Sequence, residues 1–169
     1  DEVIEEGKAM NATGTGITGG DPMLDLEKTL EAVRQLKAAF GPDHHVHAYT
    51  SIPFEPDRAA DFGAAGLDEI RFHLLDGTTS KYRATMEACA EHGIEVGVEL
   101  PCEPDKEAQL FALLEDLATV PVSFLNLNEL EITVGNQENM DGRGFNLSGG
   151  ITAAAEGSAE LAIRLKEAA

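Results

Sequence analysis

The chain has 169 residues, of which 43% are hydrophobic, and it carries 31 acidic against 12 basic side chains, a formal net charge of −19. This size predicts a single domain over residues 1–169 with a sizeable core, and no run of eighteen apolar residues is available to span a membrane. Nucleic acid and anionic lipid are excluded as partners because no basic stripe offsets the acidic surface. The first residues, Asp1 to Glu6, form no apolar signal segment, so we expect a cytoplasmic protein.

Acidic residues are spread over the predicted loops and helix faces rather than gathered in a tail. This distribution favours a halophilic protein adapted to high salt, with an ordinary acidic cytosolic protein as the alternative. The two cysteines, Cys89 and Cys102, form no Cys-x-x-Cys pair and no metal quartet. We expect both to be structural, with a place in the lining of a site as the alternative for Cys102, and we assign no metal ligand within the chain.

Apolar periodicity predicts strands that alternate with helices along the chain. The expected strands are residues 12–18, 45–50, 69–74, 94–100 and 122–130. The expected helices are the tail of one over residues 1–10, then 25–40, a short helix after Pro56 that closes at Gly63 or Gly66, 80–91, 105–118, and a last helix through Leu161, Ile163 and Leu165. A Gly- and Asn-rich loop, residues 135–150, precedes that helix. The order favours an α/β fold with a parallel sheet and outer helices.

Parallel strands that are covered on both faces should be almost entirely apolar. These strands instead alternate polar with apolar residues, and the polar or small set is His45, His47 and Tyr49, then Glu69, Arg71 and His73, then Glu95, Gly97 and Glu99, then Asn126 and Asn128. The apolar set must meet the helices, which leaves the polar set to line a lumen. We therefore predict a partial, open (β/α) barrel of the TIM-barrel type, with a two-layer sheet whose polar face meets water as the alternative.

The first predicted strand carries Gly14-x-Gly16-x-x-Gly19, which has the spacing of a dinucleotide-binding fingerprint. That motif needs a strand before its first glycine and a helix at its third. Here the glycines lie inside the strand, and the next strand ends Ala48-Tyr49-Thr50 without the acidic residue that binds ribose. We interpret the match as accidental.

The end of this strand, Ile17-Thr18-Gly19-Gly20-Asp21-Pro22, resembles the second barrel strand of the radical SAM (radical S-adenosylmethionine) family, especially enzymes similar to the pyruvate formate-lyase activating enzymes. The later strands resemble the family's third to sixth strands: His47-Ala48-Tyr49-Thr50-Ser51, Glu69-Ile70-Arg71-Phe72-His73, Gly93 to Glu99, and Phe124 to Glu129. The resemblance covers nearly the whole chain, and Gly-Gly-Asp-Pro is its most specific part. It implies a barrel that lacks the family's first strand.

The resemblance also implies a set of cofactor-binding residues. Gly19, Gly20 and Asp21 would hold the amino group of S-adenosylmethionine, although the family usually has Glu in place of Asp21. Thr50 and Ser51 would lie near the methionine end. Arg71 and His73 would meet the carboxylate, ribose or substrate, unless they pair with Glu95 or Glu99. The set is completed by Glu99, Asn126 and Asn128, and no catalytic residue is assigned.

The family's Cys-x-x-x-Cys-x-x-Cys loop, which binds three irons of a 4Fe-4S cluster, has no counterpart in this chain. Because Asp1–Met10 matches the helix that follows that loop, we expect the missing strand and cysteines upstream. The complete enzyme would cleave S-adenosylmethionine reductively at the cluster and generate a radical on a protein or small-molecule substrate, as a glycyl-radical-enzyme activase does. The fragment alone would be inactive, and the exposed edge of its first strand offers a surface for a homodimer.

A second class of function stays open from the same residues. In a non-redox (β/α) barrel, either a lyase or hydrolase or a ligand-binding barrel, Arg71, His73, Glu99 and Asn128 would form a polar site of their own. The sequence upstream of residue 1 separates the two classes, because only the radical SAM hypothesis requires the cysteine triad.

The charge imbalance generates the first prediction. Mutual repulsion among 31 acidic side chains should destabilise the fold in dilute buffer, and salt should screen it. The melting temperature, followed by circular dichroism, should rise clearly between low and molar KCl. A flat profile would remove the salt-adaptation hypothesis.

Overall fold

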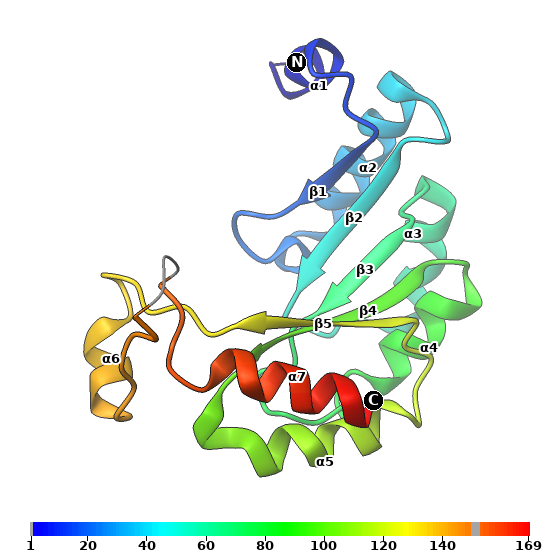
Figure 1. Cartoon of the computed structure of the whole chain (residues 1–169). Helices are drawn as coiled ribbons and strands as arrows, with labels where there is room; N and C mark the ends of the chain where they lie inside the picture. Colours follow the sequence, from blue (N-terminus) through cyan, green and yellow to red (C-terminus); the bar gives the residue numbers. More distant parts are fainter. Residues whose placement is uncertain (1, 150–152) are drawn as a thin grey trace.

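The computed structural model describes residues 2–149 and 153–169, which are built around one sheet of parallel strands in the order β1-β2-β3-β4-β5 (Figure 1). The strands are β1 (Gly14–Ile17), β2 (His45–Thr50), β3 (Glu69–Phe72), β4 (Glu95–Cys102) and β5 (Phe124–Glu129). The helices are α1 (Glu2–Ala9), α2 (Leu26–Phe40), α3 (Ala59–Ala65), α4 (Arg83–Glu91), α5 (Glu107–Leu117), α6 (Gln137–Gly142) and α7 (Ser158–Ala168). Short 3-10 turns lead into three of these helices: η1 (Pro22–Leu24), η2 (Pro56–Arg58) and η3 (Pro104–Lys106).

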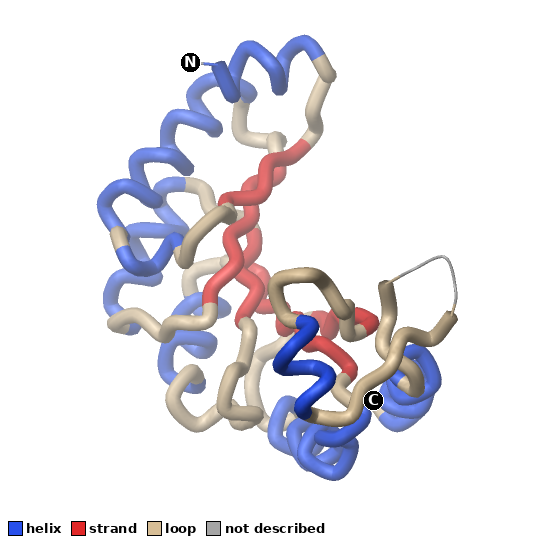
Figure 2. Tube along the Cα trace, turned by 90° about the vertical axis from the view of Figure 1, so that its left-hand side faces the viewer, coloured by secondary structure: helices blue, strands red, loops and turns tan. Residues whose placement is uncertain are grey.

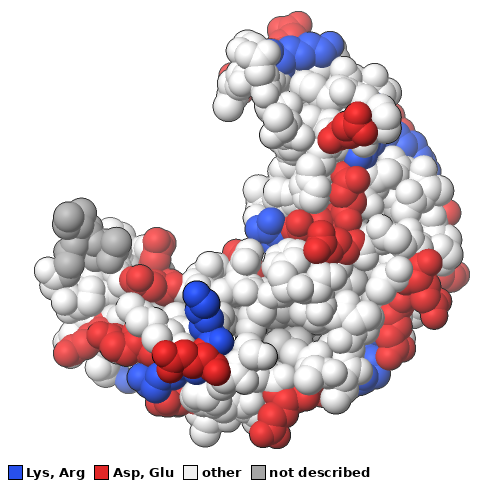
Figure 3. All heavy atoms as spheres, turned by 45° about the vertical axis from the view of Figure 1, so that its right-hand side comes forward, with Lys and Arg blue, Asp and Glu red and all other residues white. Residues whose placement is uncertain are grey.

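The sheet is strongly curved, and the helices α2, α3, α4, α5 and α7 lie along its outer side (Figures 1 and 2). The space-filling view has the outline of an open arc, with a hollow on the inner side (Figure 3). Within the described residues, β1 and β5 each pair with one neighbour, so the sheet does not close on itself. The predicted α/β fold, a parallel sheet with outer helices, is thereby confirmed, and the curved, unclosed sheet agrees with the predicted partial barrel.

Buried and half-buried residues alternate along the strands, and the buried ones show which face of the sheet meets the core. In β2 the buried residues are Val46, Ala48 and Thr50, and the residues between them are half-buried. The buried set joins the apolar faces of the helices in one hydrophobic core, whose largest members include Phe62, Phe72, Tyr82, Met86, Leu30 and Leu161. The complementary set, which begins with His45 and His47, therefore faces the hollow, as the alternation predicted.

Several predicted boundaries are corrected by one to three residues. The third strand ends at Phe72, so His73 follows the strand instead of belonging to it. The fourth continues through Pro101 to Cys102, because Pro101 lies beyond the last residue that pairs with β3 and faces a partner only on the β5 side. The fourth helix begins at Arg83, three residues later than expected.

The predicted loop 135–150 contains the short helix α6, which the sequence analysis missed. A small separate cluster of buried Leu130, Met140 and Ala155, with Ile132 and Phe145 against it, holds this segment. Arg143 ties it to the main body by ion pairs with Glu103 and Asp105. Asp1 and Gly150, which end two of the predicted segments, lie outside the described residues. No helix of the described residues combines the length and apolarity needed to cross a bilayer.

Glycines on the inner face lie opposite large side chains of the neighbouring strand. Gly16 pairs with His47 in the β1–β2 register, and a Cβ at Gly16 would come within 2.6 Å of His47 Nε2. Gly97 pairs with Phe124 across β4 and β5, and a Cβ there would lie 2.1 Å from the ring. The glycine spacing that imitates a dinucleotide fingerprint thus serves, in part, to make room for a histidine.

This pairing generates a second prediction. Gly97→Ala should lower the free energy of unfolding by about 1–3 kcal/mol, because the ring of Phe124 must move out of its place. Urea denaturation measures the loss. The matched control is Gly142→Ala, where an added Cβ meets no atom within 4 Å. If both variants are as stable as the unaltered chain, the Phe124 ring is not fixed by the fold.

Candidate functional site

A cavity of about 370 Å³ opens at the carboxyl ends of β1 to β4, the edge at which parallel sheets bind ligands. Its lining consists of Gly20, Asp21, Tyr49, Thr50, Ser51, Arg71, His73, Leu75 and Glu99. Most of the residues expected at a cofactor site are therefore brought together. Gly19 lines an adjoining cavity of about 460 Å³ toward α2. Asn126 and Asn128 line a third cavity, of about 380 Å³, between β5 and α7.

Asp21 fixes the turn that leaves β1. Its Oδ1 accepts hydrogen bonds from Met23 N (3.0 Å) and from Thr50 Oγ1 (2.8 Å). Its Oδ2 accepts from both Ser51 N (2.7 Å) and Ser51 Oγ (3.0 Å). An ionised carboxylate has about four lone-pair positions, and each of these is in use. The predicted site residues Asp21, Thr50 and Ser51 therefore form one unit that joins the end of β1 to the end of β2.

Gly19 and Gly20 present bare backbone beside this unit. Gly19 has a φ of +106°, a conformation that side chains other than glycine rarely adopt. A Cβ at either position would meet no atom within 4 Å. Within the described chain, the N–H and C=O groups of these two residues take part in no hydrogen bond. The turn thus leaves polar backbone groups free at the cavity edge for a bound molecule.

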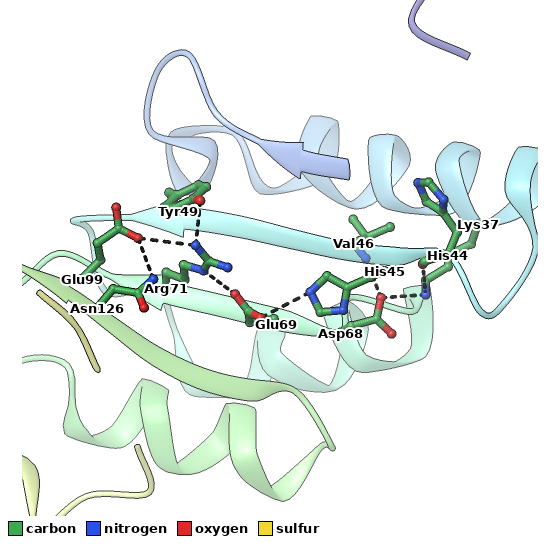
Figure 4. Close-up of polar contacts among 10 residues, drawn as sticks. All are labelled: Lys37, His44, His45, Val46, Tyr49, Asp68, Glu69, Arg71, Glu99 and Asn126. Carbon is green, nitrogen blue, oxygen red and sulfur yellow. Dashed lines mark hydrogen bonds and ion pairs between the residues drawn. The ribbon is translucent and has the colours of Figure 1, made fainter. Parts of the chain in front are cut away.

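Arg71 projects from β3 into the hollow and organises the polar side chains around it (Figure 4). Its Nε donates to Glu69, and its Nη1 donates to Tyr49 Oη at 2.9 Å and to Glu99 Oε2 at 3.5 Å. The guanidinium also lies over the rings of Tyr49, at 5.1 Å, and Phe124, at 5.5 Å. This arrangement confirms that Arg71 lies on the inner face.

The pKa values of this group follow from the contacts. Burial acts to lower the pKa of Arg71, but the hydrogen bond and charge of Glu69 outweigh it and raise that pKa above its ordinary value. Burial, and next the positive charge of Arg71, lower the pKa of His47. At neutral pH the hollow therefore contains a permanent guanidinium beside a neutral imidazole.

The two asparagines reach the same network through Glu99. Asn126 Nδ2 donates to Glu99 Oε2 at 3.3 Å, and Asn128 Nδ2 donates to Glu99 Oε1 at 2.9 Å. Glu99 therefore connects the cavity at β1 to β4 with the asparagines of β5.

His73 lies at the cavity wall, and its backbone N–H donates to Thr50 O at 2.8 Å.

Tyr49 is a site residue that the sequence analysis did not select. It lines the cavity, accepts a hydrogen bond from Arg71 through its hydroxyl group, and packs against the His47 ring in a T-shaped arrangement. The sequence did contain a signal for Tyr49: it lies two residues after His47 in an alternating strand, so the two side chains lie on the same face of the sheet. Phe124 was also missed, because it begins its strand and lies outside the Asn126 and Asn128 pair.

Both cysteines are buried thiols, as expected from their surroundings. Burial raises the pKa of Cys89 to about 12. Burial, followed by the charge of Glu129, raises the pKa of Cys102. Since thiolates are the ligands of iron–sulfur clusters, neither cysteine is suited to hold one.

Comparison with known proteins gives one informative relative. The chain is 32% identical over 174 aligned residues to a protein of Methanocaldococcus jannaschii that is provisionally named a glycyl-radical enzyme activating enzyme. The match covers 98% of this chain and 46% of the relative, so the chain spans about half the length of the protein that it matches. No protein-family profile matches the sequence.

Two solved structures share the general arrangement only weakly. The carboxyl transferase domain of Rhizobium etli pyruvate carboxylase has 13% identity and a TM-score of 0.49, over 68% of this chain and 24% of that one. A Coccidioides immitis protein provisionally named a fructose-1,6-biphosphate aldolase has 19% identity and a TM-score of 0.44, over 85% and 49%. Neither likeness is close enough to support an argument.

The sequence motifs indicated a resemblance to the radical SAM activating enzymes, and the match along almost the whole chain to a relative named as an activating enzyme confirms that resemblance. The particular relative is the Methanocaldococcus jannaschii protein, and the 169 residues correspond to a part of it.

The contacts of Asp21 generate a third prediction. Asp21→Asn replaces one acceptor oxygen by an NH₂ group that must face N–H or O–H donors of Met23, Thr50 or Ser51. Leaving such buried groups unpaired should cost about 1–3 kcal/mol of stability, measurable by urea denaturation. Asp43→Asn is the control, because Asp43 is exposed and makes no side-chain hydrogen bond within the described residues. Equal stability of the two variants would contradict the role assigned to Asp21.

Proposed function

We propose that this chain is the incomplete barrel of a radical SAM activating enzyme. In its complete form the enzyme would bind S-adenosylmethionine at the carboxyl edge of the sheet, next to a 4Fe-4S cluster. Reductive cleavage of the bound cofactor supplies a radical that abstracts hydrogen from a substrate. The observation that carries the proposal is the match over 98% of the chain to a relative named for this activity.

The residues at the edge suit the methionine part of the cofactor. Free carbonyl groups at Gly19 and Gly20 would accept hydrogen bonds from its ammonium group, and the absence of side chains permits close approach. Since the oxygens of Asp21 are occupied by Met23, Thr50 and Ser51, we propose that Asp21 positions the glycine turn rather than binding the ammonium group directly.

Arg71 is suited to bind a negatively charged group of the cofactor, such as its carboxylate. The hydrogen bonds within the described chain use its Nε and Nη1, which leaves the N–H groups of Nη2 for a carboxylate or a ribose hydroxyl group. We propose His73 as a further contact, because it lies at the same wall. Glu99, oriented by Asn126 and Asn128, would accept from hydroxyl groups of the ribose or the substrate.

We place the cluster ligands outside these 169 residues, because Cys89 and Cys102 are buried and have raised pKa values. The relative is about twice the length of the matched segment, which leaves room for such a loop. Its name also suggests the substrate class, a protein in which a glycyl radical is formed. The open inner face of the sheet would leave space for a segment of that protein (Figure 3).

The fourth prediction tests the role of the glycine turn. In the complete reading frame, reconstituted anaerobically with iron and sulfide, Gly20→Val should reduce cleavage to 5′-deoxyadenosine by about tenfold or more, which corresponds to about 1.4 kcal/mol. The new side chain would project into open space, so folding should be unaffected, as circular dichroism can verify. Gly135→Val is the matched control, because a Cβ there would contact only Thr133 Oγ1, at 3.8 Å.

Two results would contradict the proposal. The 169-residue chain by itself should stay colourless after reconstitution and bind S-adenosylmethionine weakly in calorimetry, so a stable cluster on this chain would be inconsistent with it. A complete reading frame without a cysteine triad, or one that assembles a cluster without cleaving the cofactor, would make the non-redox barrel the better hypothesis.

A further inference from the structure

A second group of polar side chains lies nearer the amino ends of the same strands, on the inner face. His45 and His47 come from β2 and Glu69 from β3, and the β2–β3 register pairs His47 with Glu69 (Figure 4 shows His45 and Glu69). One nitrogen or oxygen atom of each residue lies within 4.8 Å of those of the other two. His45 Nε2 and Glu69 Oε2 are 3.3 Å apart. None of these residues lines the cavity at the carboxyl edge.

The carboxylate of Glu69 is held in a fixed orientation. Arg71 Nε donates to Oε1, whereas Oε2 is turned toward His45. The Glu69 side chain is only 8% exposed, so a second positive partner at Oε2 is favourable. An outer hydrogen bond of this kind is the usual support of a carboxylate that ligates a metal.

His47 is placed by the strands on either side of it. Gly16 of β1 has no side chain and so leaves room for the His47 imidazole. The ring of Tyr49 packs against the imidazole in a T-shaped arrangement, with 5.3 Å between the ring centroids. Its Nδ1 is buried and has no hydrogen-bond partner in the described chain. A buried nitrogen without a partner is costly, and a cation coordinated by this Nδ1 would remove that cost.

We propose that His45, His47 and Glu69 bind one divalent transition-metal ion, with zinc as the best fit. Two imidazoles and a carboxylate form a donor set that zinc accepts at about 2.0–2.2 Å, with about 3.3 Å between ligand atoms in tetrahedral geometry. The His45–Glu69 separation already has this value. Magnesium and calcium are disfavoured, because they prefer all-oxygen sites.

Three protein ligands leave a fourth position open to the hollow, for water or for an anionic group of a bound molecule. The net charge of −19 favours the accumulation of cations around the chain. The proposed ligands are other residues at another place on the strands, so metal binding can be tested separately from the function proposed above. The competing explanation is that Glu69 only forms ion pairs with Arg71 and His45.

The fifth prediction concerns metal binding by the 169-residue chain after removal of metals with a chelator. Calorimetry with Zn²⁺ should give one site per chain, and Co²⁺ should develop visible d–d absorption that Zn²⁺ abolishes. In the double variant His45→Gln, His47→Gln the affinity for Zn²⁺ should fall by about 100-fold or more. The reason is that loss of an outer-sphere partner alone lowers metal affinity by about 10–100-fold.

The control is His92→Gln, since His92 is exposed on the outer side at the end of α4; its affinity for zinc should equal that of the unaltered chain. His45→Gln alone is a second variant that should fold, because the His45 side chain is 44% exposed, and it should also weaken binding. Absence of a zinc site in the unaltered chain, or binding that survives in the double variant, would overturn the proposal in favour of simple ion pairing.

Discussion

Arg71 provides the positive charge on which the inner face of the sheet depends. Glu69 of β3 and Glu99 of β4 project into the same hollow. Their carboxylates would repel each other without a cation between them. The guanidinium contacts both, and its side chain is only 20% exposed. Its planar group also packs on Tyr49 and Phe124. A lysine would keep the charge but lose the separate directions in which Nε and Nη1 donate.

Room for these side chains comes from glycine. Large inner residues at positions 47 and 124 lie against Gly16 and Gly97 of the adjacent strands. A parallel sheet normally fills its inner face with branched apolar residues. Here glycine and aromatic or imidazole rings alternate across neighbouring strands, so the face is both polar and closely packed. The same device explains why the first strand contains glycines that imitate a nucleotide-binding motif.

Much of the fold could be predicted from the sequence, because alternation fixes the face on which each strand residue lies. Val46 and Ile70 were assigned to the core and Arg71 to the hollow on that basis, and the structure agrees. The helix α6 could not be predicted, since Met140 is its only buried residue and its packing depends on distant Leu130 and Ala155. The hydrogen bonds that Thr50 and Ser51 donate to Asp21 could not be predicted either, because they depend on how the loops after β1 and β2 meet. The group of His45, His47 and Glu69 requires the β2–β3 register, which residue spacing within one strand does not give.

The position of Arg71 between the two ends of the strands has a consequence for both proposed sites. Toward the amino ends, Nε orients Glu69; toward the carboxyl edge, Nη1 contacts Tyr49 and Glu99, and Nη2 remains available. An anion that binds at the cavity can therefore use Nη2 without displacing Glu69. Rotation of the guanidinium toward such an anion would instead release Oε1 of Glu69 and free the carboxylate to bind a metal through both oxygens. Because a single planar group supplies all of these donors, its orientation is the physical quantity that would couple the two sites.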